Sequence, residues 1–323
     1  MIDLNARTYP YSHTIGIDDF SGRSFRNAVD LAVGKEDVLY VLQRGVEMQR
    51  NLAVKICNVN EEYFGDFGSY GTGPGEWIWP GGIAVDANHR LYISDEWNQK
   101  ITIFDEKGNF LSEWGEAGTD HGQLNRPNGL AFDNNQRLLV VDALNHRIQR
   151  FEYDGTFIDA WGQKGTKHGQ FDMPWGVAVS PEGHIFVSDW RNDRIQKFDE
   201  EGRVLLVWGC SGVAEGEFDR PAGIAVDSTG DVYVADWRNH RIQIFNSDGV
   251  FRAQLNGEAT MSKWGEQLLS ANPLMMEERR VAKDLNQEKT LWHPRSIKVD
   301  SQGRIIIVDS GRGRLQVYQK PEI

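Results

Sequence analysis

The pattern of hydrophobic and polar positions repeats along most of the chain. The stretch from Pro221 to Phe245 reads PAGIAVDSTGDVYVADWRNHRIQIF. Its runs GIAVD, VYVAD and RIQIF are rich in β-branched residues, and a Gly/Asp turn and a polar loop separate them. Such runs predict three antiparallel strands, and GVFRAQL directly afterwards predicts a fourth. We therefore expect one unit to form a four-stranded sheet.

The unit recurs at a fixed period. Three further units precede it at steps of 47 residues, and they begin at Pro80, Pro127 and Pro174. Pro294 opens another copy 73 residues after Pro221 instead of 47, which indicates an insertion of 26 residues. A copy with a longer polar loop begins at Ala28. A period of this length, built from strands, is typical of a β-propeller, so the chain is predicted to be all-β with six blades.

The last copy ends at Tyr318 and leaves no room for a fourth strand. Near the N-terminus, YSHTIG aligns with FLSEWG, the fourth strand of another unit. We therefore expect residues 9–16 to complete the sixth blade and to close the ring without an open sheet edge. One propeller domain, 1–323, is expected, with blades at 28–57, 80–115, 127–162, 174–209, 221–256 and 294–318.

The insertion, residues 257–293, contains the helical pattern NPLMMEERRVAKDL. Asn272 is a candidate N-cap and Pro273 suits the first helical position. Because the segment joins the fifth blade to the first strand of the sixth, we expect it to fold over the ligand-facing ring as a helical cap. Whether it covers a ligand, recruits a partner or only packs on the rim stays open. The apolar residues that bear on this question are Trp264, Leu274, Met275, Met276, Val281 and Leu285.

An aspartate and a basic residue lie five positions apart in five of the units. This spacing lets a carboxylate contact a guanidinium across a hairpin. Because the arrangement repeats, we interpret it as scaffold. The pairs are Asp142 and Arg147, Asp189 and Arg194, Asp236 and Arg241, Asp309 and Arg314, and, with a weaker donor, Asp95 and Lys100.

The sequence motif D-x-x-N-H-R-I-Q resembles the NHL repeat. Its Asn-His-Arg positions are Asn145-His146-Arg147 and Asn239-His240-Arg241. The resemblance covers essentially the whole chain and implies a six-bladed propeller. It implies no single function, because relatives include RNA-binding domains, protein-interaction modules, sensor domains and enzymes.

Among enzymes of this architecture, the outline is similar to peptidyl-hydroxyglycine amidating lyase. Arg44-Gly45 resembles an Arg-Gly of that family, which implies an active-site role for Arg44. The three zinc-binding histidines of the family would fall at Gly81, Trp175 and Arg295, and its catalytic tyrosine at Leu144. These side chains cannot form a three-histidine zinc centre, so we predict no metal and no cofactor.

Function is expected where the repeats differ, on the face formed by the start of strand one and the end of strand two. Blades six, one and two differ most, and they are neighbours in a closed ring. Two arginines beside aromatic walls would suit a carboxylate or phosphate on a mainly apolar ligand. Alternatively, Arg44 replaces a lost ion pair and Arg295 points to solvent. The predicted ligand-binding residues are Arg44, Arg295, Asn128, Trp79, Trp175, Trp190 and Trp237, and Glu96 and His293 are the candidate acid and base.

The composition limits the classes of binding partner and the cellular location that we expect. The net charge of −12 disfavours non-specific nucleic-acid binding. The first twenty residues include charged side chains and no apolar stretch for a signal peptide, and no later run is long enough for a membrane span, so we expect a cytoplasmic protein. Cys57 and Cys210 form neither a disulfide framework nor a zinc site.

The sequence thus predicts a propeller that binds a small anionic, partly apolar ligand in a central funnel under the cap, with or without lyase or hydrolase chemistry. The alternative is a non-catalytic protein-interaction scaffold or sensor that uses the same face. RNA binding fits least. No nucleophile has an activating partner visible in the sequence, and Ser310 alone supports no catalytic triad.

Overall fold

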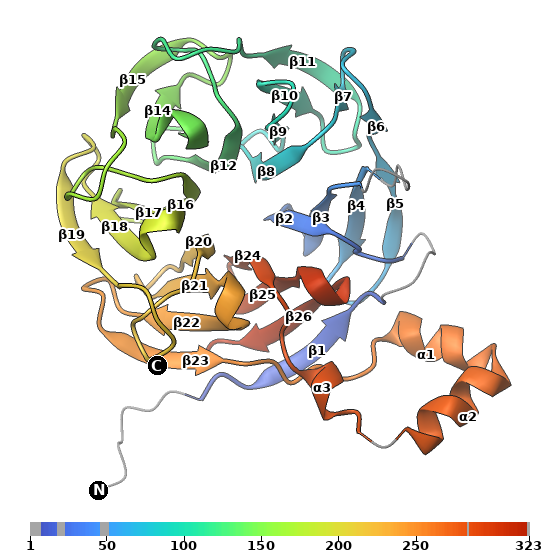
Figure 1. The fold of residues 1–323 in the computed structure, drawn as a ribbon. Coiled ribbons are helices and arrows are strands. Elements are labelled where there is room, and N and C mark those ends of the chain that lie inside the picture. The colour runs from blue at the N-terminus through green and yellow to red at the C-terminus, as the bar shows by residue number, and fades with distance from the viewer. Residues whose placement is uncertain (1–7, 18–22, 46–51, 283, 322–323) are drawn as a thin grey trace, which may run out of the picture.

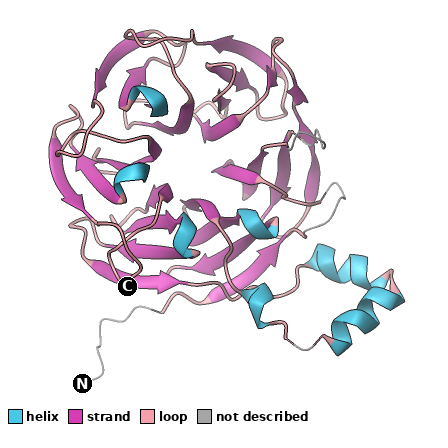
Figure 2. Ribbon diagram, in the orientation of Figure 1, coloured by secondary structure: helices cyan, strands magenta, loops and turns pink. Residues whose placement is uncertain are grey.

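The six predicted sheets form a closed ring around a central channel (Figure 1). The computed structural model describes residues 8–17, 23–45, 52–282 and 284–321. Each sheet has four antiparallel strands, and its innermost strand contacts the innermost strands of the two neighbouring blades. The predicted six-bladed propeller is confirmed. Within the described residues, helix is confined to single turns and to one insertion (Figure 2).

The blades follow one another along the chain, each running from its inner to its outer strand. Blade one contains β2 (Ala28–Val33), β3 (Val38–Gln43), β4 (Ala53–Asn58) and β5 (Tyr63–Phe67). Blade two contains β8 (Pro80–Val85), β9 (Leu91–Asp95), β10 (Lys100–Phe104) and β11 (Phe110–Trp114). Blade three contains β12 (Pro127–Phe132), β13 (Leu138–Asp142), β14 (Arg147–Phe151) and β15 (Phe157–Trp161). A short parallel pair, β6 (Ser69–Tyr70) and β7 (Glu76–Trp77), lies between blades one and two in the sequence.

Blade four contains β16 (Pro174–Val179), β17 (Ile185–Asp189), β18 (Arg194–Phe198) and β19 (Val204–Trp208). Blade five contains β20 (Pro221–Val226), β21 (Val232–Asp236), β22 (Arg241–Phe245) and β23 (Phe251–Leu255). Blade six contains β24 (Pro294–Val299), β25 (Arg304–Asp309) and β26 (Arg314–Gln319). Single 3-10 turns follow the second strand of blades three to six: η1 (Ala143–Asn145), η2 (Trp190–Asn192), η3 (Trp237–Asn239) and η4 (Ser310–Arg312).

The strand β1 (Tyr11–Ile15) supplies the fourth strand of blade six. It pairs antiparallel with β26, with Tyr11 opposite Tyr318 and Ile15 opposite Leu315. Ile15 is fully buried in a hydrophobic cluster that packs between blades six and one. The predicted closure of the ring by an N-terminal strand is therefore confirmed.

Glycines allow the inner strands to approach one another. A Cβ at Gly82, Gly129 or Gly176 would lie 2.5–2.6 Å from a carbonyl oxygen of the next blade, which is closer than a carbon atom can stand. At the equivalent positions, blades one and six carry Asp30 and Ser296. Their side chains are joined by a hydrogen bond of 2.5 Å, in which Ser296 Oγ donates to Asp30 Oδ1. The seam between the first and last blades therefore has a side-chain link where other blades have close backbone contact.

The repeated ion pairs form in blades three to six. In each of them the arginine Nε lies 2.8 Å from the aspartate Oδ2. Blade two is different, and our prediction there is wrong. Lys100 Nζ contacts Glu113 Oε2 at 2.7 Å, while the Asp95 carboxylate accepts the backbone N–H groups of Ile78 and Trp79. A single ammonium cannot make the several parallel bonds by which a guanidinium joins the aspartate to the inter-blade loop.

The insertion forms α1 (Lys263–Ser270), α2 (Pro273–Val281) and α3 (Asn286–Lys289). The Asn272 side chain caps α2, with Pro273 in its first turn, as the sequence predicted. In Figure 1, however, α1 and α2 lie outside the ring and not over its channel. Leu274 and Val281 are exposed. The expectation of a cap over the ligand-facing ring is therefore wrong.

The position of the insertion follows from its anchor. Trp264 is buried at the outer edge of blade one, where its ring contacts those of Phe25 and Tyr63 and its Nε1 donates to Glu61 O at 2.7 Å. The insertion follows β23, which is the outermost strand of blade five. Trp264 therefore packs at the outer edge of the ring and not over the central channel. No helix among the described residues has the length and hydropathy of a membrane span.

Candidate functional site

One face of the ring collects the ends of inner strands from all blades. Each first strand begins on this face, and each second strand ends on it, because the two run antiparallel. Arg44 follows β3, Glu96 follows β9, and Trp190 and Trp237 open η2 and η3. The scaffold therefore places these non-equivalent side chains around one opening.

Arg44 and Glu96 form an ion pair between blades one and two. Arg44 Nη2 contacts Glu96 Oε1 and its Nε donates to Pro80 O at 3.3 Å. Asn128 Nδ2 donates to the same Glu96 oxygen at 3.0 Å. The Arg44 guanidinium lies 5.7 Å from the centroid of the Trp79 ring. Four predicted site residues thus meet, and the carboxylate of Glu96 holds Arg44 and Asn128 in place.

Arg295 lies next to this group without a carboxylate of its own. Among the described residues, its guanidinium has neither a hydrogen-bond acceptor nor an ion-pair partner, although it lies 5.9 Å from the centroid of the Trp237 ring. Burial and the positive charge of Arg44 lower the pKa of Arg295 to about 10, and Glu96 opposes this only in part. The site therefore contains a partly buried cation that has no ion-pair partner among the described residues.

An aromatic wall lines the other side of the opening. The rings of Trp175 and Trp190 stack with centroids 5.6 Å apart, and Trp190 and Trp237 are 6.2 Å apart. Trp237 lies 5.1 Å from His293. The wall runs across blades four, five and six, and offers an apolar surface beside the arginines.

His293 ends the wall. Its pKa is lowered by burial and, to a lesser extent, by His240 and by the positive charges of Arg295 and Arg238. The backbone N–H of His293 donates to His240 Nδ1 at 3.1 Å, so the neutral His240 carries its proton on Nε2. The His293 imidazole is therefore neutral near pH 7 and available as a base.

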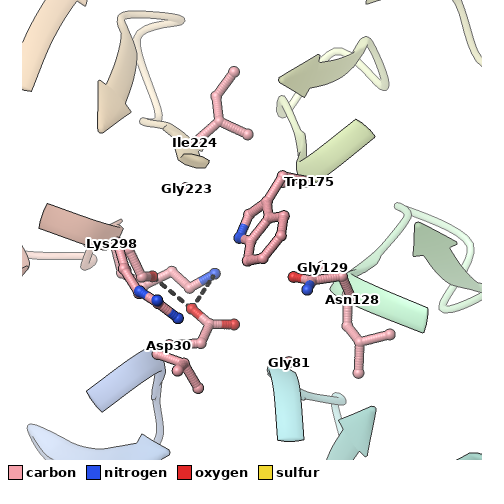
Figure 3. Close-up of a pocket in the computed structure, with 13 residues that line it drawn as sticks. Asp30, Gly81, Asn128, Gly129, Trp175, Gly223, Ile224 and Lys298 are labelled. Atoms are coloured by element: carbon pink, nitrogen blue, oxygen red, sulfur yellow. Dashed lines mark hydrogen bonds and ion pairs between the residues drawn. The ribbon is translucent and has the colours of Figure 1, made fainter. Parts of the chain in front are cut away.

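Two cavities meet at Arg295. The wider one, of about 230 Å³, is lined by Asn27, Val29, Arg44, Gly45, Trp237, His293, Arg295, Ser310 and Gly311. The narrower one follows the central channel and holds about 20 Å³, roughly the room of one water molecule. In Figure 3 the Trp175 indole projects into this channel, with Asp30 and Lys298 on the opposite side. Ser310 donates to Ala28 O and has no base beside it among the described contacts.

The positions that correspond to the zinc ligands of the amidating lyase do converge. Gly81, Trp175 and Arg295 all line the narrow channel. None of these side chains ligates a metal, and over the described ranges no cluster of three His, Cys, Asp or Glu residues is arranged to hold one. The arrangement favours binding of an anion at Arg295 over binding of a cation.

The sequence analysis missed Arg126 and Arg220, which lie on the same face. The guanidinium of Arg126 is 5.7 Å from the centroid of the Trp79 ring and that of Arg220 is 4.9 Å from the centroid of the Trp190 ring. Both precede the opening proline of a blade, in the slot that His293 occupies in blade six, and all three have positive φ. The signal was present, because this position varies among the repeats and includes the predicted residues Trp79 and His293, but the arginines at the same position in blades three and five were not recognised.

Comparison with known proteins agrees with this architecture. The model of the NHL repeat matches residues 124–151, 171–198, 218–245 and 291–318. A search of curated proteins finds no match. The chain therefore carries NHL repeats in a six-bladed propeller.

Several solved propeller structures are similar over nearly the whole chain. Virginiamycin B lyase from Staphylococcus aureus shares 10% identity at a TM-score of 0.57, covering 97% of this chain and 100% of that one. A gluconolactonase from Xanthomonas campestris shares 17% identity at 0.59, covering 98% and 100%. An auxiliary nutrient binding protein from Bacteroides ovatus shares 14% identity at 0.62, covering 97% and 73%. At these identities the likeness establishes the fold.

Proposed function

We propose that this NHL-repeat propeller binds a small anionic, partly apolar ligand at the opening of its central channel. Arg295 and Arg44 bind the anionic group, and Trp237, Trp190 and Trp175 contact the apolar part. The observation that carries the proposal is Arg295, a partly buried guanidinium that lines the wider cavity beside Trp237 and has no acceptor among the described residues.

The energetics favour an anion. Arg295 is partly removed from water, and a cation that has lost water without gaining a partner is destabilised. An anion that reaches Arg295 offsets this cost, and each charge-assisted hydrogen bond adds about 1.5–3 kcal/mol. Arg44 can bind the anion without breaking its ion pair with Glu96, because that pair leaves other N–H groups of the guanidinium available.

The aromatic wall supports the apolar part of the ligand. Ligand pockets are commonly lined by aromatic side chains with a few polar groups that fix orientation. Trp237 and Arg295 line the same cavity of about 230 Å³. A small aromatic or aliphatic body with one acidic group would match this combination.

Lyase or hydrolase chemistry is a second candidate, favoured by the neutral His293 beside Arg295. In such a reaction His293 would accept a proton from the bound substrate, and Arg295 would stabilise the negative charge that develops. Arg44 and Asn128 both contact the Glu96 carboxylate. We assign it a positioning role.

Binding of 3-phenylpropionate tests the proposal, with the neutral alcohol 3-phenylpropanol as the matched ligand. Tryptophan fluorescence reports binding directly because three indoles form the wall. Arg295→Ala should weaken binding of the acid at least about tenfold, equal to roughly 1.4 kcal/mol. Arg203→Ala is the control variant, because Arg203 lies in an exposed turn on the opposite face.

Equal affinity for the acid and the alcohol, or an Arg295→Ala variant that binds the acid as wild type does, would contradict the proposal. If Arg295→Ala instead loses a co-purifying protein while carboxylates never bind, the face is an interaction scaffold. Turnover of an ester, lactone or lyase substrate that His293→Gln abolishes, with binding retained, would support catalysis.

A further inference from the structure

A second cavity lies at the outer edge of the ring, between the insertion and blade six. Its volume is about 460 Å³, about twice that of the cavity at Arg295, and no described residue lines both. Its walls come from the end of β1, from the insertion, and from η4 and β26. Figure 1 shows the insertion beside β1, on the outside of the ring. The insertion therefore borders a space of its own, of a size that small-molecule sites commonly have.

Part of this lining is apolar and remains in contact with solvent. The apolar side chains come from the segment after β1, from α1 and its preceding loop, and from the connection between α2 and α3. None of them is fully buried. An apolar body in the cavity would remove their surface from water, which is favourable. The side chains are Ile17, Met261, Leu268, Leu269 and Leu285.

The polar part of the lining departs from the repeat at Arg312. The corresponding residue of blades two to five is an asparagine, whose side chain donates to a glycine carbonyl in the loop before the blade. In blade six the insertion takes the place of that loop. Arg312 Nη2 donates instead to Gln287 O of α3 at 2.6 Å, and its guanidinium lies 5.9 Å from the centroid of the Trp292 ring. The repeat thus changes from an amide to a cation in the blade that borders the cavity.

Arg312 and Lys289 bring positive charge to the cavity without a carboxylate of their own. Neither side chain forms an ion pair with any described residue, and Arg312 Nε is buried without an acceptor. Arg312 is bonded to α3 and Lys289 ends that helix, so the two cations border the same part of the cavity. In a chain with a net charge of −12, this local excess of positive charge favours an anion. The other lining arginines have carboxylate partners at 2.8 Å, in the pairs Arg279–Glu288 and Arg314–Asp309.

We infer that this cavity is a second ligand site, which takes a carboxylate with an unbranched apolar chain, such as a fatty acid of medium length. The carboxylate binds Arg312 and Lys289, and the chain lies against Leu268, Leu269 and Leu285. The inference goes beyond the proposed function, because the cavity is separate from the opening at Arg295.

Titration calorimetry with saturated carboxylates, from butanoate to dodecanoate, tests the inference. The Arg295→Ala protein is used beside the wild type, because it lacks the anion-binding group of the central opening. Each added methylene should raise the affinity about twofold to fourfold until the chain fills the cavity. Decanoate should bind at least about tenfold more tightly than the neutral 1-decanol.

Matched variants separate the cavity from the rest of the insertion. Arg312→Ala should weaken decanoate binding at least about tenfold, whereas Arg280→Ala, at an exposed arginine outside the cavity, should leave it unchanged. Leu268→Glu places a carboxylate beside the ligand and should have a similar effect, whereas Leu274→Glu, at an exposed leucine outside the cavity, should have none. Lys289→Ala should weaken binding about threefold, and because this exposed side chain has no described partner, it tests the charge without disturbing the fold.

The location is tested with a decanoate that carries a photoreactive diazirine at its far end. Mass spectrometry of the digested protein should find the label within residues 259–289. Labelling confined to the surroundings of Trp237, equal affinity for decanoate and decanol, or Arg312→Ala and Lys289→Ala variants that bind as their controls do would each overturn the inference. Absence of decanoate binding would also overturn it, and would leave the site at Arg295 standing on its own test with 3-phenylpropionate. Thermal unfolding as in the wild type shows that a variant that has lost binding is still folded.

Discussion

The ion pair between Arg44 and Glu96 gives a sharp prediction, because removal of either partner should have opposite effects on ligand binding. Glu96→Gln keeps the shape of the side chain and an oxygen that accepts from Asn128, but it removes the negative charge beside Arg44. Arg44 and Arg295 then both lack a carboxylate, and an anionic ligand no longer competes with Glu96. Anion affinity should therefore rise.

The magnitude follows from burial. The Glu96 side chain is 7% exposed and that of Arg44 is 21% exposed. Breaking a fully buried pair costs about 3–5 kcal/mol, and an exposed pair is worth at most about 1 kcal/mol. For this partly buried pair we expect Glu96→Gln to lower the free energy of unfolding by about 2 kcal/mol. The gain in anion affinity should be about tenfold, because a like charge near the ligand is removed.

Arg44→Ala should lower stability by a similar amount but should weaken anion binding about tenfold, because it removes a cation and leaves Glu96 to pair with Arg295. Urea unfolding followed by fluorescence measures the stability, and titration with 3-phenylpropionate measures the affinity. Weaker binding in both variants would refute the reasoning, because Glu96 would then contact the ligand instead of holding Arg44.

Three further predictions test the scaffold and its pH dependence. Arg194→Ala should destabilise the protein by about 3–5 kcal/mol in urea unfolding, because it leaves the fully buried Asp189 carboxylate without its guanidinium. Lys100→Ala, at the equivalent position with a partner whose side chain is 29% exposed, should cost about 1 kcal/mol or less, and equal costs would contradict the scaffold role. Ile15→Ala should cost about 2–5 kcal/mol in the same assay because Ile15 is fully buried, and a neutral effect would show that β1 does not hold the ring closed. The folded state lowers the pKa values of His146, His240 and His293, so the unfolded chain binds more protons at acidic pH. The free energy of unfolding should therefore fall as the pH drops below the ordinary histidine pKa of about 6.5. A thermal unfolding temperature that stays constant from pH 7 to pH 5 would count against this.

The repeat made most of the fold predictable. A fixed period with alternating apolar positions defines strands, blades and ring order, and ring order alone placed blades six, one and two side by side. This is why the convergence of Arg44, Glu96 and Arg295 could be anticipated from one sequence. The ion-pair partner that a basic side chain contacts within its blade could not be predicted from the repeat. Lys100 occupies the slot of the scaffold arginines, yet its flexible ammonium reaches Glu113 on the next strand instead of Asp95.

The insertion was harder because no other blade has an equivalent. Its helix start was readable from Asn272 and Pro273, which act locally. Its position depended on where Trp264 finds a buried environment, and that environment is formed by Phe25 and Tyr63, far away in the sequence. A local pattern predicts a helix, whereas its docking site is a property of distant residues.

The pairing of β1 with β26 also determines how the ring responds to force. Tyr11 pairs with Tyr318 at one end of this strand pair, and Ile15 pairs with Leu315 at the other. Tension applied to the two segments that leave the pair at Tyr11 and Tyr318 would load one hydrogen bond at a time, in unzipping geometry, and not all of them together in shear. A ring that is held closed by a fully buried Ile15 against thermal unfolding would therefore open at low force when it is pulled from these two points.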